Sequence, residues 1–284
     1  DKIEDAIIDI REGKIIIVVD DEDRENEGDF ICAAETVTPE IINFMATHGR
    51  GLICAPLDER RVEELELNMM VSNNTALHET AFTVSIDLMG YDCSTGISAY
   101  DRATGIKKLT DPSIVAKDYA RPGHIFPLKA RQGGVLRRTG HTEAAIDLAR
   151  LAGFYPAGVL VEILNPDGTM ARLPELFEIA EKFELKIVAI RDLVAYRLKM
   201  ESLIKKELSF PVDSPHGKFL ITAYTQIYSG EVHLAVTIGK WSIDEPVLVR
   251  VHSSVTPNDI FASLFSDNSS LIHKALKQIA REGK

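Results

Sequence analysis

The sequence predicts an α/β fold of the α+β kind, with a mixed sheet covered by helices in the first domain and a smaller β-rich C-terminal domain. Short β-branched runs alternate with amphipathic helical segments over residues 1–200. After residue 212, apolar runs separated by turn residues dominate. The chain has 284 residues, of which 45% are hydrophobic and 26% charged, so its composition is that of an ordinary globular protein.

The elements of the first domain follow from local patterns. Apolar residues at helical spacing from Ile3 to Ile10 predict an opening helix, and the β-branched run at 15–19 predicts a buried strand. Thr38-Pro39-Glu40 predicts a helix start, because it combines a capping hydroxyl, proline at the first position and an early acid. The same patterns predict strands at 30–34, 51–57, 82–87, 159–164 and 186–190, and helices at 101–109, 142–152 and 174–183.

The second domain begins after a predicted helix at 192–206 and a Pro-rich linker at 211–215. Apolar runs predict strands at 219–223, 232–238 and 247–251, and 271–279 returns to a helical pattern. A boundary near 205–212 gives domains of residues 1–205 and 212–284. A unit of this size is marginal for independent stability.

Charge and cysteine content exclude several classes of protein. The 32 basic and 43 acidic residues give a net charge of −11, which argues against a nucleic-acid partner. No apolar run approaches the roughly 18–20 residues that span a bilayer, so no membrane partner is expected. The odd, sparse set Cys32, Cys54 and Cys93 has no metal-binding spacing and predicts a reducing cytoplasmic location, with Cys54 a small buried residue.

An acidic run lies between the first two predicted strands. Seven of the ten residues from Asp20 to Asp29 are acidic and one is basic. A solvated surface loop is the ordinary interpretation of such a run, but its position at a strand end favours a cleft. Crowded carboxylates repel one another, and a divalent cation relieves that repulsion. Asn26 stands where a calcium EF-hand needs glycine, and Mg²⁺ fits better because it needs few protein ligands.

A second cluster, Arg137 to Glu143, runs directly into an alanine-rich helix. Thr142 as a helix cap and Glu143 in the first turn suit any helix start. The two adjacent arginines and Gly140 are the groups that bind phosphate beside free amides at a helix N-terminus. Such a site would provide the local positive charge that an anionic ligand needs in this acidic protein.

Two further residues are candidates for proton transfer. His124 lies within Arg121 to Leu128, where two prolines and a glycine predict a shaped loop, and imidazole titrates near neutral pH. Glu162 is the one acid in an apolar predicted strand. If Glu162 faces the core, its charge must be paired or its pKa shifted, whereas simple alternation would place it in solvent.

Four collinear motifs together resemble 3,4-dihydroxy-2-butanone-4-phosphate synthase, an enzyme of riboflavin biosynthesis. The resemblance covers about residues 1–200 and rests on Asp20 to Asp29, Thr95 to Ala99 followed by Asp101-Arg102-Ala103, Arg121 to Leu128, and Arg138-x-Gly140-His141-Thr142. It implies a lyase that converts D-ribulose 5-phosphate to 3,4-dihydroxy-2-butanone 4-phosphate and formate through an enediolate stabilised by Mg²⁺, with Mn²⁺ as an alternative cation. It also implies a homodimer.

The resemblance assigns roles to individual residues. Glu25 and His141 hold the metal, and His124 and Glu162 are essential for catalysis. The substrate contacts fall on Arg24, Glu25, Asp29, Arg138, Thr139, Gly140, His141, Thr142 and Glu162. The chemistry agrees, since removal of a proton beside a carbonyl needs a base and a cation. We expect Glu162 and His124 to share the proton transfers, with Asp29 and Glu27 as alternative bases.

The C-terminal segment from Phe210 to Lys284 resembles the start of GTP cyclohydrolase II. The resemblance is visible in Val247 to Ser253 and in Leu271 to Gly283. That family binds zinc through three cysteines, and the matching positions hold Val255, Ser266 and Asn268. None of these side chains offers a thiolate, so we expect a partial domain without zinc and without cyclohydrolase activity.

Two other functions remain open at this point. The chain could be a non-catalytic scaffold or regulator of the flavin pathway, which the altered metal positions of the second domain favour. The first domain could also be a sugar-phosphate isomerase that stops at the enediolate. The intact acidic run and the Arg138 to Thr142 motif favour the synthase.

Overall fold

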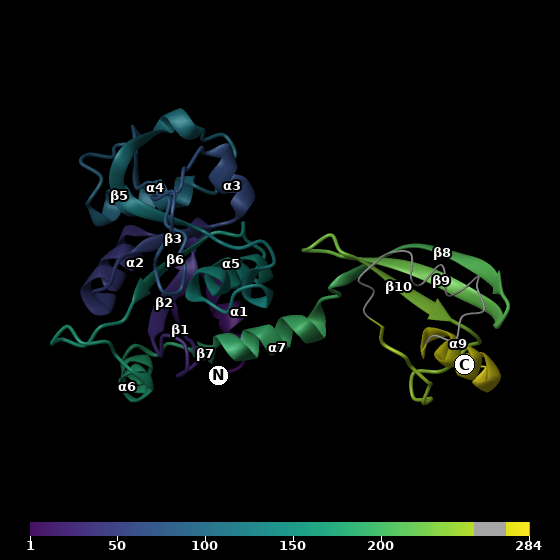
Figure 1. Ribbon diagram of the computed structural model, residues 1–284. Coiled ribbons are helices and arrows are strands. Elements are labelled where there is room, and N and C mark those ends of the chain that lie inside the picture. The colour runs from purple at the N-terminus through teal and green to yellow at the C-terminus, as the bar shows by residue number, and fades with distance from the viewer. Residues whose placement is uncertain (253–270, 284) are drawn as a thin grey trace. The chain divides into compact units, whose positions relative to one another are not determined.

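The computed structural model describes residues 1–252 and 271–283. The chain divides into two compact units, residues 1–201 and 202–284, and each is described by itself (Figure 1). The division lies between Glu201 and Ser202, a few residues before the predicted boundary at 205–212. No helix in the described part of the chain is long and apolar enough to cross a membrane.

The first unit is built on a mixed seven-stranded sheet with the order β4-β5-β3-β6-β2-β1-β7. β1 pairs antiparallel with β2 and parallel with β7, and β3 pairs parallel with β5 and antiparallel with β6. This confirms the predicted mixed sheet. The strands are β1 (Ile16–Val19), β2 (Gly28–Ala33), β3 (Cys54–Leu57), β4 (Ile86–Leu88), β5 (Tyr119–Lys129), β6 (Gly158–Glu162) and β7 (Ile187–Ala189).

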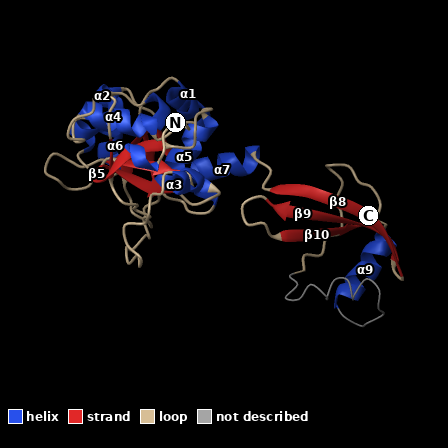
Figure 2. Cartoon of the chain, turned by 90° about the horizontal axis from the view of Figure 1, so that it is seen from above, coloured by secondary structure: helices blue, strands red, loops and turns tan. Residues whose placement is uncertain are grey.

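Helices lie around this sheet (Figure 2). The sheet separates the apolar core of the unit into two clusters, one on each face. α1, α5 and α7 pack on the face that carries Ile16, Ile31 and Leu160. α2, α4 and α6 pack on the opposite face with Ile17 and Phe30. The helices are α1 (Ile3–Arg11), α2 (Pro39–Phe44), α3 (Glu59–Glu64), α4 (Ala99–Lys108), α5 (His141–Leu151), α6 (Leu173–Phe183) and α7 (Ile190–Met200).

The predicted N-cap of α2 is confirmed, whereas the predicted N-cap of α5 is not. The Thr38 hydroxyl accepts a hydrogen bond from the Ile41 amide at 3.3 Å, as an N-cap does. α5 begins one residue before the prediction, at His141, with Gly140 as its N-cap and no side-chain cap. The assignment of Thr142 as the cap was therefore wrong, because Thr142 already lies inside the helix.

The segment around His124 is a strand and not the predicted loop. β5 spans residues 119–129 and pairs with β4 on one side and β3 on the other. Pro127 lacks an amide donor but takes part in strand pairing through its carbonyl, which accepts from the Thr83 amide at 3.1 Å. The strand predicted at 82–87 corresponds to β4, which is shorter and spans only Ile86–Leu88. α3 was not predicted.

The described residues of the second unit form a three-stranded sheet and one helix. Its strands β8 (Ile204–Ser214), β9 (Gly217–Gln226) and β10 (Val232–Thr237) have the order β10-β9-β8, and α9 (Leu271–Glu282) contributes Leu276 to a small core. The predicted linker at 211–215 was wrong, because β8 runs through it. β8 is an edge strand of this sheet, where Pro211 is tolerated. The helix predicted to reach 206 ends at Met200, and 247–251 is not a strand.

Candidate active site

The acidic run forms a tight loop, residues 20–27, between the paired strands β1 and β2. Asp20 organises it: one carboxylate oxygen accepts from the Glu27 amide at 2.9 Å, and the other accepts from the Glu25 amide at 3.1 Å. Arg24 donates to the same second oxygen at 2.9 Å and to Glu25 at 2.6 Å. The Asp20 side chain is buried. The loop is thus folded around a carboxylate that sequence analysis did not single out.

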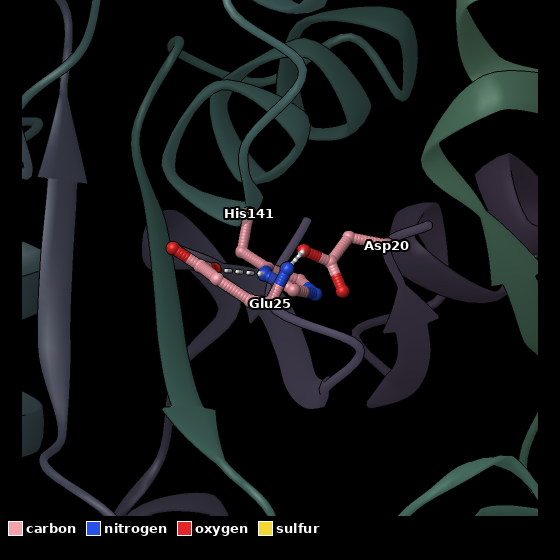
Figure 3. A group of neighbouring side chains, drawn as sticks. All are labelled: Asp20, Glu25 and His141. Atoms are coloured by element: carbon pink, nitrogen blue, oxygen red, sulfur yellow. Dashed lines mark hydrogen bonds and ion pairs between the residues drawn. The ribbon is translucent and has the colours of Figure 1, made fainter. Parts of the chain in front are cut away.

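Glu25 lies beside His141, the first residue of α5 (Figure 3). The Nδ1 atom of His141 is 3.7 Å from a Glu25 carboxylate oxygen, and its Nε2 atom is 3.2 Å from the carbonyl oxygen of Val18. A carbonyl can only accept, so Nε2 carries a proton and donates to Val18. Nδ1 therefore faces Glu25, as a metal-binding imidazole nitrogen would. The structure brings the two predicted metal ligands together.

The charges in this cluster are strongly coupled. Burial alone would raise the pKa of Glu25, but the nearby His141 imidazole and the Arg24 guanidinium outweigh it and lower that pKa to about 2. Burial opposes protonation of His141, yet Asp29 and Glu25 raise its pKa to about 9. Burial raises the pKa of Asp29 to about 7. A cation placed here would meet the firmly ionised carboxylate of Glu25, would favour the ionised form of Asp29 that burial disfavours, and would replace a proton on His141.

The donor set fits a divalent cation. Asp20, Glu25 and His141 each offer a ligand atom, and these atoms lie within 4.8 Å of one another. Both oxygens of Asp20 already accept backbone hydrogen bonds, so Asp20 also serves to hold the loop in this arrangement. One buried oxygen of Asp29 has no hydrogen-bond partner. Few protein ligands with room for water and substrate oxygens match the preference of Mg²⁺.

Asp29 and Glu162 are direct cross-strand neighbours on β2 and β6. Both point to the face that α5 covers, since Ile31 and Leu160, two residues away on the same strands, pack there. Glu162 is half-buried and accepts from the Leu52 amide at 2.8 Å. Its carboxylate is therefore fixed beside Asp29 and does not project freely into solvent.

Two guanidinium groups meet at the N-terminus of α5. A Cβ atom on Gly140 would collide with the guanidinium of Arg138 and would lie 3.1 Å from that of Arg24. Arg138 donates to Glu143 at 2.7 Å and to the His78 carbonyl at 3.0 Å. The first amides of a helix lack intrahelical acceptors, so arginines and amides converge as phosphate binding requires. Thr142 is buried within this first turn, whereas Thr139 is exposed.

His124 is held by Asp87 and is separate from Glu162. Asp87 accepts from the His124 amide at 2.9 Å, and its other oxygen is 2.7 Å from Nδ1 of His124. Phe126 and Leu160 both pair with Cys54 of β3. His124 comes two residues before Phe126 and Glu162 two residues after Leu160. Because β5 is parallel and β6 antiparallel to β3, the two residues lie level with each other on either side of β3, roughly 10 Å apart. The structure does not bring these two predicted catalytic residues into contact.

Sequence reasoning missed three residues of this site. Asp20 had a usable signal, since it directly follows the strand that precedes the acidic run. Asp87 gave none, because an acid near the end of a predicted strand is ordinary. Arg172 also gave none, although it donates to the backbone carbonyls of Glu25 and Asn26.

A mixed α/β domain that gathers carboxyl groups, one imidazole and two arginines at the end of its strands has the groups that metal-dependent enzymes acting on small phosphorylated compounds use. Comparison with known proteins gives the family. Residues 4–196 match the 3,4-dihydroxy-2-butanone 4-phosphate synthase family, and residues 205–284 match the GTP cyclohydrolase II family. The chain therefore belongs to the 3,4-dihydroxy-2-butanone 4-phosphate synthase family and carries a GTP cyclohydrolase II-type domain behind it.

Relatives agree with this assignment. The "Riboflavin biosynthesis protein RibBA" of Cytophaga hutchinsonii is 62% identical over 284 residues, which is the whole chain and 70% of that protein. The protein of the same name from Aquifex aeolicus is 56% identical over 283 residues, 99% of the chain and 70% of that protein. These names place the chain among riboflavin biosynthesis proteins.

Solved structures resemble both the first unit and the whole chain. RibBX of A. baumannii, described as a two-domain 3,4-dihydroxy-2-butanone 4-phosphate synthase, is 40% identical with a TM-score of 0.76, over 99% of this chain and 87% of that one. A 3,4-dihydroxy-2-butanone 4-phosphate synthase in complex with two magnesium ions is 42% identical with a TM-score of 0.67, over 70% of this chain and 98% of that one.

Proposed function

We propose that the first unit converts D-ribulose 5-phosphate to 3,4-dihydroxy-2-butanone 4-phosphate and formate. The observation that carries this proposal is the pairing of Glu25 with His141 beside the buried Asp29. Family membership and the structural neighbour with two magnesium ions support it. Mg²⁺ is the proposed cation, and Mn²⁺ is its alternative.

Glu25 and Nδ1 of His141 are the residues that would hold the cation. When bound, a divalent cation supplies positive charge that makes the proton beside a carbonyl easier to remove. Arg24 keeps Glu25 ionised and also faces the phosphate end. Arg138 and the N-terminal turn of α5, from Thr139 to Thr142, would bind the phosphate through charge-assisted and amide hydrogen bonds.

Glu162 and His124 would carry out the proton transfers from two sides of the substrate. Glu162 has its carboxylate fixed by the Leu52 amide. Asp87 beside Nδ1 of His124 leaves Nε2 available to accept or donate a proton. Because β3 separates them, Glu162 and His124 are better placed to transfer protons in two different steps of the reaction than to pass one proton between them. Asp29 and Glu27 remain alternative bases, and burial raises the pKa of both carboxyls, Asp29 to about 7.

The second unit is proposed to be non-catalytic and free of zinc. The positions that would supply zinc-binding cysteines, Val255, Ser266 and Asn268, lie outside the described residues, and the argument rests on their side-chain chemistry. The neighbour from A. baumannii, which the chain matches over both units, is described as a two-domain synthase. The match of residues 205–284 to the GTP cyclohydrolase II family makes GTP turnover the test of this assignment. We also propose a homodimer in the cytoplasm.

Product analysis tests the proposed function. The purified chain is incubated with ribulose 5-phosphate, with Mg²⁺ or with EDTA. Formate release that requires Mg²⁺ supports the synthase, ketose interconversion without formate would support an isomerase, and no conversion would support a scaffold. Stoichiometric zinc together with GTP turnover would overturn the assignment of the second unit.

A further inference from the structure

Arg172, at the N-cap of α6, reaches back to the acidic loop. Its Nη1 atom donates to the carbonyl of Glu25 at 3.0 Å and also to the carbonyl of Asn26. Asn26 has a φ of +55°, in the left-handed region that non-glycine residues seldom adopt. Arg172 therefore binds the loop at its most constrained residue.

The Asp20 carboxylate binds the same stretch of backbone, but as an acceptor of hydrogen bonds where Arg172 is a donor. It accepts from the amides of Glu25 and Glu27, whereas Arg172 donates to the carbonyls of Glu25 and Asn26. The peptide groups on both sides of Glu25 are thus each bound by a charged side chain. Hydrogen bonds to ionised groups are stronger than neutral ones, so this arrangement fixes the direction of the Glu25 side chain.

α6 is itself held close to the loop. A Cβ atom on Gly28 would lie 2.9 Å from one Leu176 methyl carbon and closer still to the other, so Leu176 packs directly on the β2 backbone where the loop ends. The Arg172 amide donates to Glu175 at 3.0 Å, which caps α6 without using the guanidinium. A change in the Arg172 side chain therefore leaves the cap and the Leu176 contact in place.

We propose that Arg172 is a positioning residue that pre-organises Glu25 for the divalent cation. This inference rests on the proposed function, because it assumes that Glu25 holds the cation. Among the described residues, the Arg172 side chain donates its hydrogen bonds to backbone oxygens of the loop, so it acts on Glu25 through the loop. Outer groups that orient metal ligands typically contribute about 10–100-fold to metal affinity.

The test uses Arg172→Gln, Arg172→Lys and the control Arg191→Gln, an exposed arginine on α7. Mn²⁺ affinity is measured by titration calorimetry, and amide hydrogen exchange over residues 20–27 is measured in metal-free protein. We expect Arg172→Gln to weaken Mn²⁺ binding by about 10–100-fold and to speed exchange. Arg172→Lys should recover part of both effects, and Arg191→Gln should resemble the parent.

Each outcome has a defined meaning. Unchanged exchange in Arg172→Gln would overturn the inference, and so would faster exchange with unchanged Mn²⁺ affinity. If the parent chain binds no Mn²⁺, both the proposed metal site and the positioning role that depends on it fail. In that case, exchange still reports whether Arg172 holds the loop. If Mn²⁺ binds normally to every variant, only the role of Arg172 is refuted.

Discussion

The Nδ1 atom of His141 lies 3.7 Å from the carboxylate of Glu25, although the two residues come from distant parts of the chain. Glu25 is placed by the loop between β1 and β2, and His141 by the start of α5. Val18 accepts from the other imidazole nitrogen and so orients Nδ1 toward Glu25. Because a carboxylate and an imidazole nitrogen face each other here, the acidic loop and the start of α5 together form a candidate metal centre.

Removal of the Glu25 charge should weaken metal binding. Glu25→Gln keeps the size of the side chain but removes a ligand charge, so we expect Mn²⁺ affinity to fall at least about tenfold. Titration calorimetry on the purified variant measures this. Glu22→Gln is the matched control, because Glu22 is exposed in the same loop and its loss removes the same charge. Equal losses in both variants would show that general loop charge, and not Glu25, attracts the cation.

Asp29 should make the metal-free protein less stable as pH rises. Burial raises its folded-state pKa to about 7, above the ordinary value of 3.8, so folding disfavours the ionised form. The cost is absent below about pH 4, grows between pH 4 and 7, and is complete above pH 7. Asp29→Asn should therefore stabilise the protein in EDTA by about 1–4 kcal/mol at pH 8 and much less at pH 4.5. Urea unfolding at both pH values measures the difference, and an equal effect at both would contradict this account.

Arg197 should be the strongest single tie between α7 and α5. Its buried guanidinium donates to Asp147 at 2.8 Å, to the Gly133 carbonyl at 2.7 Å and to Glu201 at 2.7 Å. Arg197→Met would leave the buried Asp147 without this partner, at a cost of about 3–5 kcal/mol. Urea unfolding measures the loss. The exposed Arg191→Met should change stability by less than about 0.5 kcal/mol. A loss below about 1 kcal/mol in Arg197→Met would show that Asp147 does not depend on this pair.

Arg138 should contribute mainly to substrate binding. Arg138→Lys keeps the charge but loses the planar fork that matches phosphate, so KM for ribulose 5-phosphate should rise by about tenfold or more, with a smaller change in kcat. Steady-state assay of formate release measures both. Arg137→Lys is the control, because the sequence pattern also pointed to Arg137 but its side chain is exposed, so KM should stay near that of the parent. If KM is unchanged in Arg138→Lys, the phosphate is bound elsewhere.

Much of the first unit was predictable from local chemistry. The capping signal at Thr38 and the β-branched run at 15–19 match α2 and β1 closely, because local preference and tertiary packing agree there. The acidic loop and the Arg138 to Thr142 motif, both quoted from the sequence, lie together in the structure and form the candidate site. Their convergence required the sheet order, in which β2 lies next to β6 and under α5.

The failures share a physical cause, since tertiary pairing overrode local signals. Proline in β5 and at Pro211 of β8 indicated loops, yet both segments pair with neighbouring strands. Contacts made through backbone atoms were equally invisible. Arg172 binds backbone carbonyls, and no side-chain pattern marks it. Asp20 binds backbone amides, and its position directly after a strand was its one sequence signal.

Anomalous diffraction from crystals soaked in Mn²⁺ tests the central claim most directly. We predict one Mn²⁺ bonded to a carboxylate oxygen of Glu25 and to Nδ1 of His141, with Asp20 still bound to the loop amides. An ordered Mn²⁺ held by other residues, with neither Glu25 nor His141 bonded to it, would contradict the account.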